Sequence, residues 1–140
     1  MRVGFTGTRG GMTGPQLLSL HRWLTDNPAT EYHDGDCVGA DDQFFRTCRY
    51  FAHAFAAKTH AHPCDIPSQR AFNHHDVLHD PEQPLVRNRD IVDAVDVMLA
   101  CPAGMQEEQR SGTWMTIRYA RKQKRRIEIF WPDGTVTEEK

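Results

Sequence analysis

Short apolar runs alternate with longer segments of helical periodicity along this 140-residue chain. The clearest runs are residues 2–6 and 95–101, and the second is apolar enough for a buried strand. Residues 44–55 instead carry apolar side chains at helical spacing. Strands that alternate with helices imply right-handed crossovers. The alternation therefore predicts an α/β fold of Rossmann-like type, a three-layer sandwich with a mainly parallel sheet.

The same pattern places the other elements. We expect further strands at 31–33, 58–62 and 126–131, and helices after the N-cap Thr13, over 39–57, over 86–94 and from Ser111 to about 123. Asp133-Gly134 is a hairpin turn signal, so residues 135–137 are predicted to add an antiparallel C-terminal edge. Residues 64–84 form the longest irregular stretch. With no linker or internal repeat, residues 1–140 are predicted to form a single domain.

Composition excludes several classes of protein. Hydrophobic residues make up 39% and charged residues 26% of the chain, which argues against disorder. The net charge of -2 gives no global attraction to nucleic acid or a membrane. The start of the chain has no charged leader followed by an apolar segment, and the four cysteines form no CxxC pair. We therefore expect a cytoplasmic protein with reduced thiols and no membrane association.

Two turns that follow strands have the chemistry of phosphate binding. Gly7-Thr8-Arg9-Gly10-Gly11 lies between a strand and a helix, where backbone amides and the helix N-terminus favour an anion. Arg9 could close over a phosphate with a bidentate contact. Ser111-Gly112-Thr113 repeats this arrangement at a second helix start. The alternatives are a tight turn with a solvent-facing arginine and a plain N-cap by Ser111.

Two further segments add charged and polar groups. Within residues 35–41, Gly35, Asp36, Gly39 and Asp41 form a turn into a helix, and either aspartate could bind ribose hydroxyls. Asp41 could instead complement the helix dipole. Arg87 and Asn88 suit a phosphate or a ribose, although this arginine could equally belong to a solvated helix start.

Taken together, these motifs resemble the SLOG superfamily. The order is Gly-Thr-Arg-x-x-Met-Thr, then Gly-Asp-x-x-Gly-Ala-Asp, then Arg-Asn-Arg-Asp-Ile-Val, and then Ser-Gly-Thr before a helix. The resemblance covers residues 3–131. The superfamily includes the Rossmann domain of DNA-processing protein A and the lonely-guy phosphoribohydrolases. It implies a nucleotide or similar phosphate-bearing ligand at the carboxyl ends of the strands, and a homo-oligomer.

The resemblance also implies a hydrolase alternative. In the phosphoribohydrolases an arginine and a glutamate serve cleavage of the N-glycosidic bond, and Arg87 matches the arginine. Thr116 stands at the glutamate position and cannot act as a carboxylate. Glu107 or Glu108 of the inserted loop could substitute. Binding and hydrolysis both stay open, and no cofactor is predicted.

Three other features have alternative interpretations. His60, His62 and Cys64 alternate before His74, His75 and His79, a pattern that could ligate zinc, but the spacing is not standard and we predict no metal site. Cys101 could be a nucleophile, although a small buried residue is the preferred interpretation. The basic run 121–126 complements a helix C-terminus and could contact single-stranded nucleic acid, which the acidic net charge disfavours.

Overall fold

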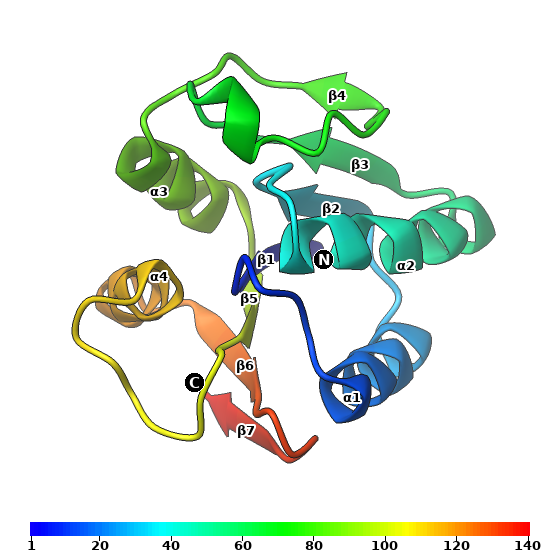
Figure 1. Cartoon of the computed structure of the whole chain (residues 1–140). Helices are drawn as coiled ribbons and strands as arrows, with labels where there is room; N and C mark the ends of the chain where they lie inside the picture. Colours follow the sequence, from blue (N-terminus) through cyan, green and yellow to red (C-terminus); the bar gives the residue numbers. More distant parts are fainter.

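Seven strands form one sheet in the computed structural model, which describes residues Met1–Lys140 (Figure 1). The strands are β1 (Arg2–Gly7), β2 (Glu31–Asp34), β3 (Lys58–Ala61), β4 (Val77–Leu78), β5 (Val97–Cys101), β6 (Arg126–Phe130) and β7 (Val136–Glu139). Their order is β4-β3-β2-β1-β5-β6-β7, with β1 at the centre. Every pair is parallel except β6 with β7, so the predicted parallel sheet and its antiparallel C-terminal edge are confirmed.

Four α-helices complete a three-layer sandwich: α1 (Gly14–Asp26), α2 (Ala40–Phe55), α3 (Pro84–Ala94) and α4 (Gly112–Lys122). Figure 1 shows α1 and α2 on one face of the sheet and α3 and α4 on the other. Strand β5, next to the central strand β1, contributes side chains to both cores. Val97, Leu99 and Cys101 pack toward α1 and α2, whereas Met98 and Ala100 pack toward α3 and α4. This alternation is the two-residue period of a strand that is buried on both faces.

Local sequence explains where the helices begin. The Thr13 hydroxyl accepts a hydrogen bond from the Gln16 amide at 3.1 Å, and the Gln16 side chain accepts one from the Thr13 amide at 2.9 Å. This capping box satisfies two amides of the first turn of α1. Ser111 caps α4 in a similar way, through a 3.3 Å hydrogen bond from the Trp114 amide. Both predicted helix starts are confirmed.

The structure differs from the expected elements mainly between residues 64 and 84. This stretch contains a 3-10 turn, Pro67–Gln69, and the two-residue strand β4, neither of which was predicted. The third helix begins at Pro84, two residues before its predicted start, because proline fits the first helical turn. None of the helices is long and apolar enough to cross a membrane.

Candidate functional site

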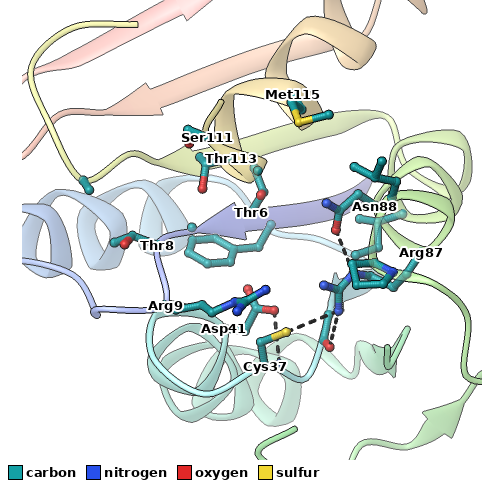
Figure 2. A pocket seen from close by; sticks show the side chains of 18 of the residues that line it. Thr6, Thr8, Arg9, Cys37, Asp41, Arg87, Asn88, Ser111, Thr113 and Met115 are labelled. Atoms are coloured by element: carbon teal, nitrogen blue, oxygen red, sulfur yellow. Dashed lines mark hydrogen bonds between the residues drawn. The ribbon is translucent and has the colours of Figure 1, made fainter. Parts of the chain in front are cut away.

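A pocket of about 460 Å³ opens at the carboxyl ends of β1 and β5 (Figure 2). These strands are direct neighbours, with Thr6 beside Ala100 and Gly7 beside Cys101. The chain continues from β1 to β2 on one side, and from β5 to β6 on the other. The order of strands therefore reverses between β1 and β5, and open α/β sheets bind their ligands at such a switch point.

The turn after β1 forms one wall of the pocket and rests directly on α2. The Thr8 carbonyl accepts a hydrogen bond from the Ala40 amide at 3.1 Å. A side chain on Gly7 would place its Cβ 2.6 Å from the Ala40 Cβ, and one on Gly39 would collide with the Arg9 carbonyl. Gly39 also has a φ of +89°. These two glycines therefore allow the start of α2 to pack under the turn.

The pocket is more positive than the chain as a whole. Its charged lining consists of Arg9, Arg87 and Arg110 with Asp41 and Glu108, whereas the chain has a net charge of -2. Arg9 and Arg110 are exposed and make no salt bridge. Two unpaired guanidinium groups at the mouth of the pocket favour an anionic ligand.

The N-terminus of α4 faces the pocket from the opposite side. Ser111, Gly112 and Thr113 all line it, and Figure 2 shows Ser111 and Thr113 across the pocket from Arg9. The first amides of a helix lack intrahelical partners, and here the cap occupies only the Trp114 amide. The amides of Gly112 and Thr113 are thus available to a ligand at the positive end of the helix.

Arg87 is buried at the far end of the pocket, where it reaches across from α3 to the loop after β2. Its Nη1 donates to the Gly35 carbonyl at 2.7 Å, and its Nε donates to the Asn88 side chain at 2.7 Å. Nη1 also lies 3.4 Å from Cys37 Sγ. Nη2 has no partner in the protein. A Cβ on Gly35 would lie 2.9 Å from Arg87 Cζ, so the glycine makes room for the guanidinium.

Asp41 lies beside this arginine and is buried. Its Oδ2 accepts a hydrogen bond from the Cys37 amide at 3.2 Å. Burial, and then the nearby Asp34 carboxylate, raise the pKa of Asp41 to about 7. A carboxyl group with this pKa can hold or release a proton near neutral pH, which suits a general acid or base.

An apolar strip lies on the α3 and α4 side of the pocket. Pro84, Leu85 and Ile91 contribute from α3, and Met115 contributes from α4. Leu85 is 50% exposed and Met115 is 39% exposed, although both are large apolar residues. A ligand with a flat apolar part would cover them. The pocket thus offers cationic groups at its mouth and at its far end, and an apolar surface along one side.

The structure brings most of the predicted site residues together. Those that line the pocket are Gly7, Thr8, Arg9, Gly35, Asp41, Arg87, Asn88, Glu108, Ser111, Gly112 and Thr113. Four predicted residues lie outside it. Gly10 is exposed on the turn, and Gly39 packs under Arg9. Asp36 is buried and accepts the Asn73 amide at 3.1 Å, while Glu107 forms salt bridges with Arg118 and Arg121, each at 3.0 Å.

Sequence reasoning missed part of the lining. Arg110 is not among the predicted site residues, although it directly precedes Ser111 and this position could have indicated it. Leu85 and Met115 carried no signal, because isolated apolar residues at helical spacing normally belong to a core. The pairing of Arg87 with Gly35 spans 52 residues, and no local pattern indicates it.

No protein family model matches the chain, and no curated protein is similar to it in sequence. Solved structures are similar. The molybdenum cofactor binding protein from the phototrophic bacterium Rippkaea orientalis superposes with a TM-score of 0.64 at 19% identity, over 93% of this chain and 76% of that one. DNA processing protein A from Streptococcus pneumoniae gives a TM-score of 0.59 at 16% identity, over 91% of this chain and 49% of that one. The chain shares their fold. This fold is the Rossmann-like one that the sequence predicts.

Proposed function

We propose that the protein binds a nucleotide or nucleotide derivative in the pocket between β1 and β5. The observation that carries this proposal is that three groups able to bind an anion line one pocket. These are the Gly7–Arg9 turn, the free amides of α4 and the buried Arg87. Positive charge is concentrated here in a chain whose net charge is negative.

The shape of the lining suggests how the ligand is oriented. Phosphate oxygens would lie between Arg9 and the amides of Gly112 and Thr113. The apolar strip around Leu85 and Met115 would receive the base, because it is the surface on which a flat ring can be buried. The Rippkaea orientalis protein of the same fold, described as binding the molybdenum cofactor, is a precedent for a ligand larger than inorganic phosphate.

A thermal-shift panel of nucleoside mono- and diphosphates, cyclic nucleotides, ADP-ribose and NAD tests the proposal. A ligand that binds only the folded protein raises Tm by mass action. We expect at least one of these compounds to raise the Tm of the wild-type protein and of Arg89→Ala, and to have no effect on Arg87→Ala. Arg89 is the matched control, since it is an exposed arginine on the same helix that does not line the pocket. No shift with any compound, or the same shift in Arg87→Ala, contradicts the proposal.

Hydrolysis of an N-glycosidic bond is the second candidate, and the position of Asp41 favours it. This carboxyl group lines the pocket beside Arg87, with a pKa near neutrality. Glu108 also lines the pocket, whereas Thr116 does not. Incubation with the ligand found above, followed by chromatography of the released base, separates the two functions. If the protein is a hydrolase, Asp41→Asn or Glu108→Gln abolishes release while the ligand still raises Tm.

The structure offers no support for the nucleic-acid alternative. Within the basic run, Arg121 binds Glu139 at 2.8 Å and Glu107 at 3.0 Å, and Arg126 binds Glu128 at 2.9 Å. Arg125 instead donates to the Val92 carbonyl at 3.1 Å. These three guanidinium groups neutralise neighbouring carboxylates or bind backbone, so they are not free to bind phosphates.

A further inference from the structure

Four histidines gather on the α3 side of the sheet, over β2, β3 and β4. His33 of β2 and His60 of β3 are paired in register, and their rings stack with centroids 4.1 Å apart. His62 and His79 follow β3 and β4, and their rings stack at 4.0 Å. No residue of these three strands belongs to the apolar core beneath α3 and α4. Polar rings therefore fill a place where apolar side chains would normally pack.

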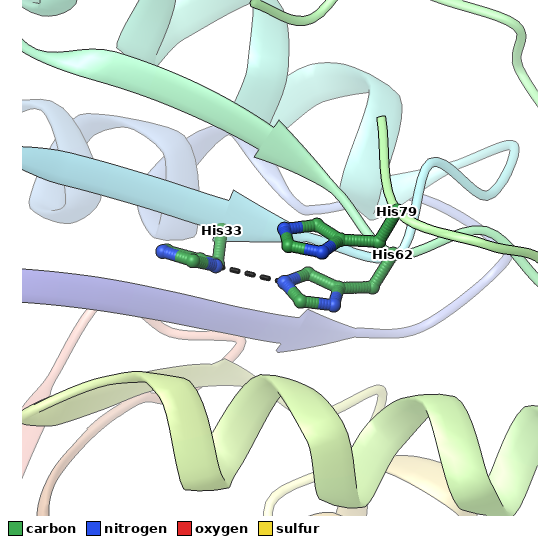
Figure 3. Close-up of side chains that lie close together, drawn as sticks. All are labelled: His33, His62 and His79. Atoms are coloured by element: carbon green, nitrogen blue, oxygen red, sulfur yellow. Dashed lines mark hydrogen bonds between the residues drawn. The ribbon is translucent and has the colours of Figure 1, made fainter. Parts of the chain in front are cut away.

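Three of these rings bring nitrogen atoms close together. One ring nitrogen each from His33, His62 and His79 lies within 4.8 Å of the other two. His33 Nδ1 is 2.8 Å from His62 Nε2, and Figure 3 shows His79 over the His62 ring. A tetrahedral zinc ion bound at about 2.0–2.1 Å holds its nitrogen ligands about 3.3 Å apart. The His62 and His79 rings are stacked with 8° between their planes, so at least one of them must turn to direct its lone pair at the ion.

Glu31 prepares His33 to act as a ligand. His33 Nε2 lies 2.7 Å from Glu31 Oε1, and a carboxylate can only accept, so Nε2 carries the proton and donates. His33 Nδ1 is then left with its lone pair directed toward His62. A carboxylate that fixes the tautomer of a histidine in this way is the usual outer partner of a zinc-bound imidazole.

The cluster is also partly enclosed and yet reachable. His33 and His62 are buried, and His79 is half-buried beside them. A cavity of about 200 Å³, lined by His62 and His79 together with Asp80, Glu82, Arg87 and Asp90, adjoins the cluster. It provides an entry path and space for a water molecule in a fourth coordination position.

We propose that His33, His62 and His79 bind a divalent transition-metal ion of the Zn²⁺ class, with Glu31 as the outer partner of His33 and the fourth position open to the adjacent cavity. Imidazole nitrogen suits zinc, copper, iron and nickel, and zinc accepts three histidines with one open position. The proposed site differs from the one that the spacing of the histidines suggests. Its first ligand comes from β2, far from the histidine-rich stretch, and Cys64 is not part of it.

A second group, formed by Glu31, His33 and His60, competes for the same ion. In that group His33 would have to bind through Nε2, which the hydrogen bond to Glu31 protonates. Glu31 is also 34% exposed, and His60 Nε2 lies 3.6 Å from it. The triad of His33, His62 and His79 uses His33 Nδ1, which keeps its lone pair. Without metal this lone pair accepts the His62 Nε2 proton, so His62 must move that proton to its other nitrogen when the ion binds. The hydrogen bond from His33 to Glu31 stays intact, so we assign the ion to the triad.

The test uses the untagged full-length protein, dialysed against a chelator and then titrated with Zn²⁺ and Co²⁺. We expect one equivalent of Zn²⁺ to bind and to raise Tm, and Co²⁺ to give the visible absorption bands of tetrahedral coordination. His62→Asn and His79→Asn should each weaken Zn²⁺ binding more than tenfold, and Glu31→Gln should weaken it about 10- to 100-fold. His74→Asn is the matched control because His74 is exposed in the same stretch, and it should bind like the wild type.

His79 is half-buried at the end of a two-residue strand, so His79→Asn keeps the test valid if the buried His62 variant does not fold. Urea unfolding of each variant, without metal, checks that it is folded. The proposal is overturned if the wild type binds no Zn²⁺, or if His79→Asn binds Zn²⁺ as tightly as His74→Asn does.

Discussion

Replacing Gly35 by alanine should displace Arg87 and destabilise the protein. The added Cβ would lie 2.9 Å from Arg87 Cζ and 2.7 Å from Asp41 Oδ2. Both side chains are buried, so the guanidinium would have to leave its 2.7 Å hydrogen bond to the Gly35 carbonyl. A hydrogen bond to a charged group contributes about 1.5–3 kcal/mol, and alanine recovers about 0.4–1 kcal/mol of unfolded-state entropy. The expected net loss in free energy of unfolding is about 0.5 to 2.6 kcal/mol.

Urea unfolding measures this loss, with Gly14→Ala as the matched control. A Cβ on Gly14 meets nothing within 4 Å, so that variant should be unchanged or stabilised by up to about 1 kcal/mol. If the loss acts through Arg87, Gly35→Ala should cost much less in an Arg87→Ala background. A Gly35→Ala variant within about 0.5 kcal/mol of the wild type, or an equal loss in both backgrounds, refutes the reasoning.

Three further predictions follow from the contacts described above. Thr13→Ala removes the capping box of α1 and should lower the free energy of unfolding by about 1 kcal/mol in urea titrations, and no loss would contradict the role of the cap. Asp41 has a folded-state pKa raised to about 7, so its contribution to stability is present in acid and lost as pH rises through 7. The unfolding free energy of the wild type minus that of Asp41→Asn should therefore fall between pH 5 and pH 8, and a flat or rising difference is the contrary result. All four cysteines are buried, and burial raises the pKa of Cys37 to about 11, so a thiol reagent should label the native protein slowly and the urea-unfolded protein fast.

Much of the fold could be predicted because its main signals are local. The apolar run 95–101 is a strand that is buried along its length, and the helical spacing of 44–55 marks the buried face of α2. Both signals lie within the segment that folds. The short strand β4 could not be predicted in this way. It has two residues and exists because the edge of β3 offers Val77 and Leu78 a parallel pairing, a tertiary contact with no periodicity of its own.

The position of the candidate pocket could be predicted, because the topology of the sheet determines which loops meet. Loops at the carboxyl ends of parallel strands meet at one edge of the sheet, so Arg9, Arg87 and Ser111 could be grouped without coordinates. The exact lining could not be grouped in this way. Asp36 accepts a hydrogen bond from the loop that carries Asn73, and Gly39 packs against the Arg9 carbonyl. Both are tertiary contacts, which no local pattern indicates.

Arg87 lies between the two proposed sites, and two variants can test the two proposals separately. It lines both the candidate pocket between β1 and β5 and the cavity beside the histidines, and Nη1 lies 3.4 Å from the His62 carbonyl. The contact is to backbone, so the His62 ring does not depend on the arginine for its position. Arg87→Ala should therefore lose nucleotide binding and keep Zn²⁺, whereas His79→Asn should lose Zn²⁺ and keep nucleotide binding. If each variant remains folded and yet loses both ligands, the two cavities act as one site, and a single ligand that contacts both the metal and the phosphate-binding turn becomes the better description.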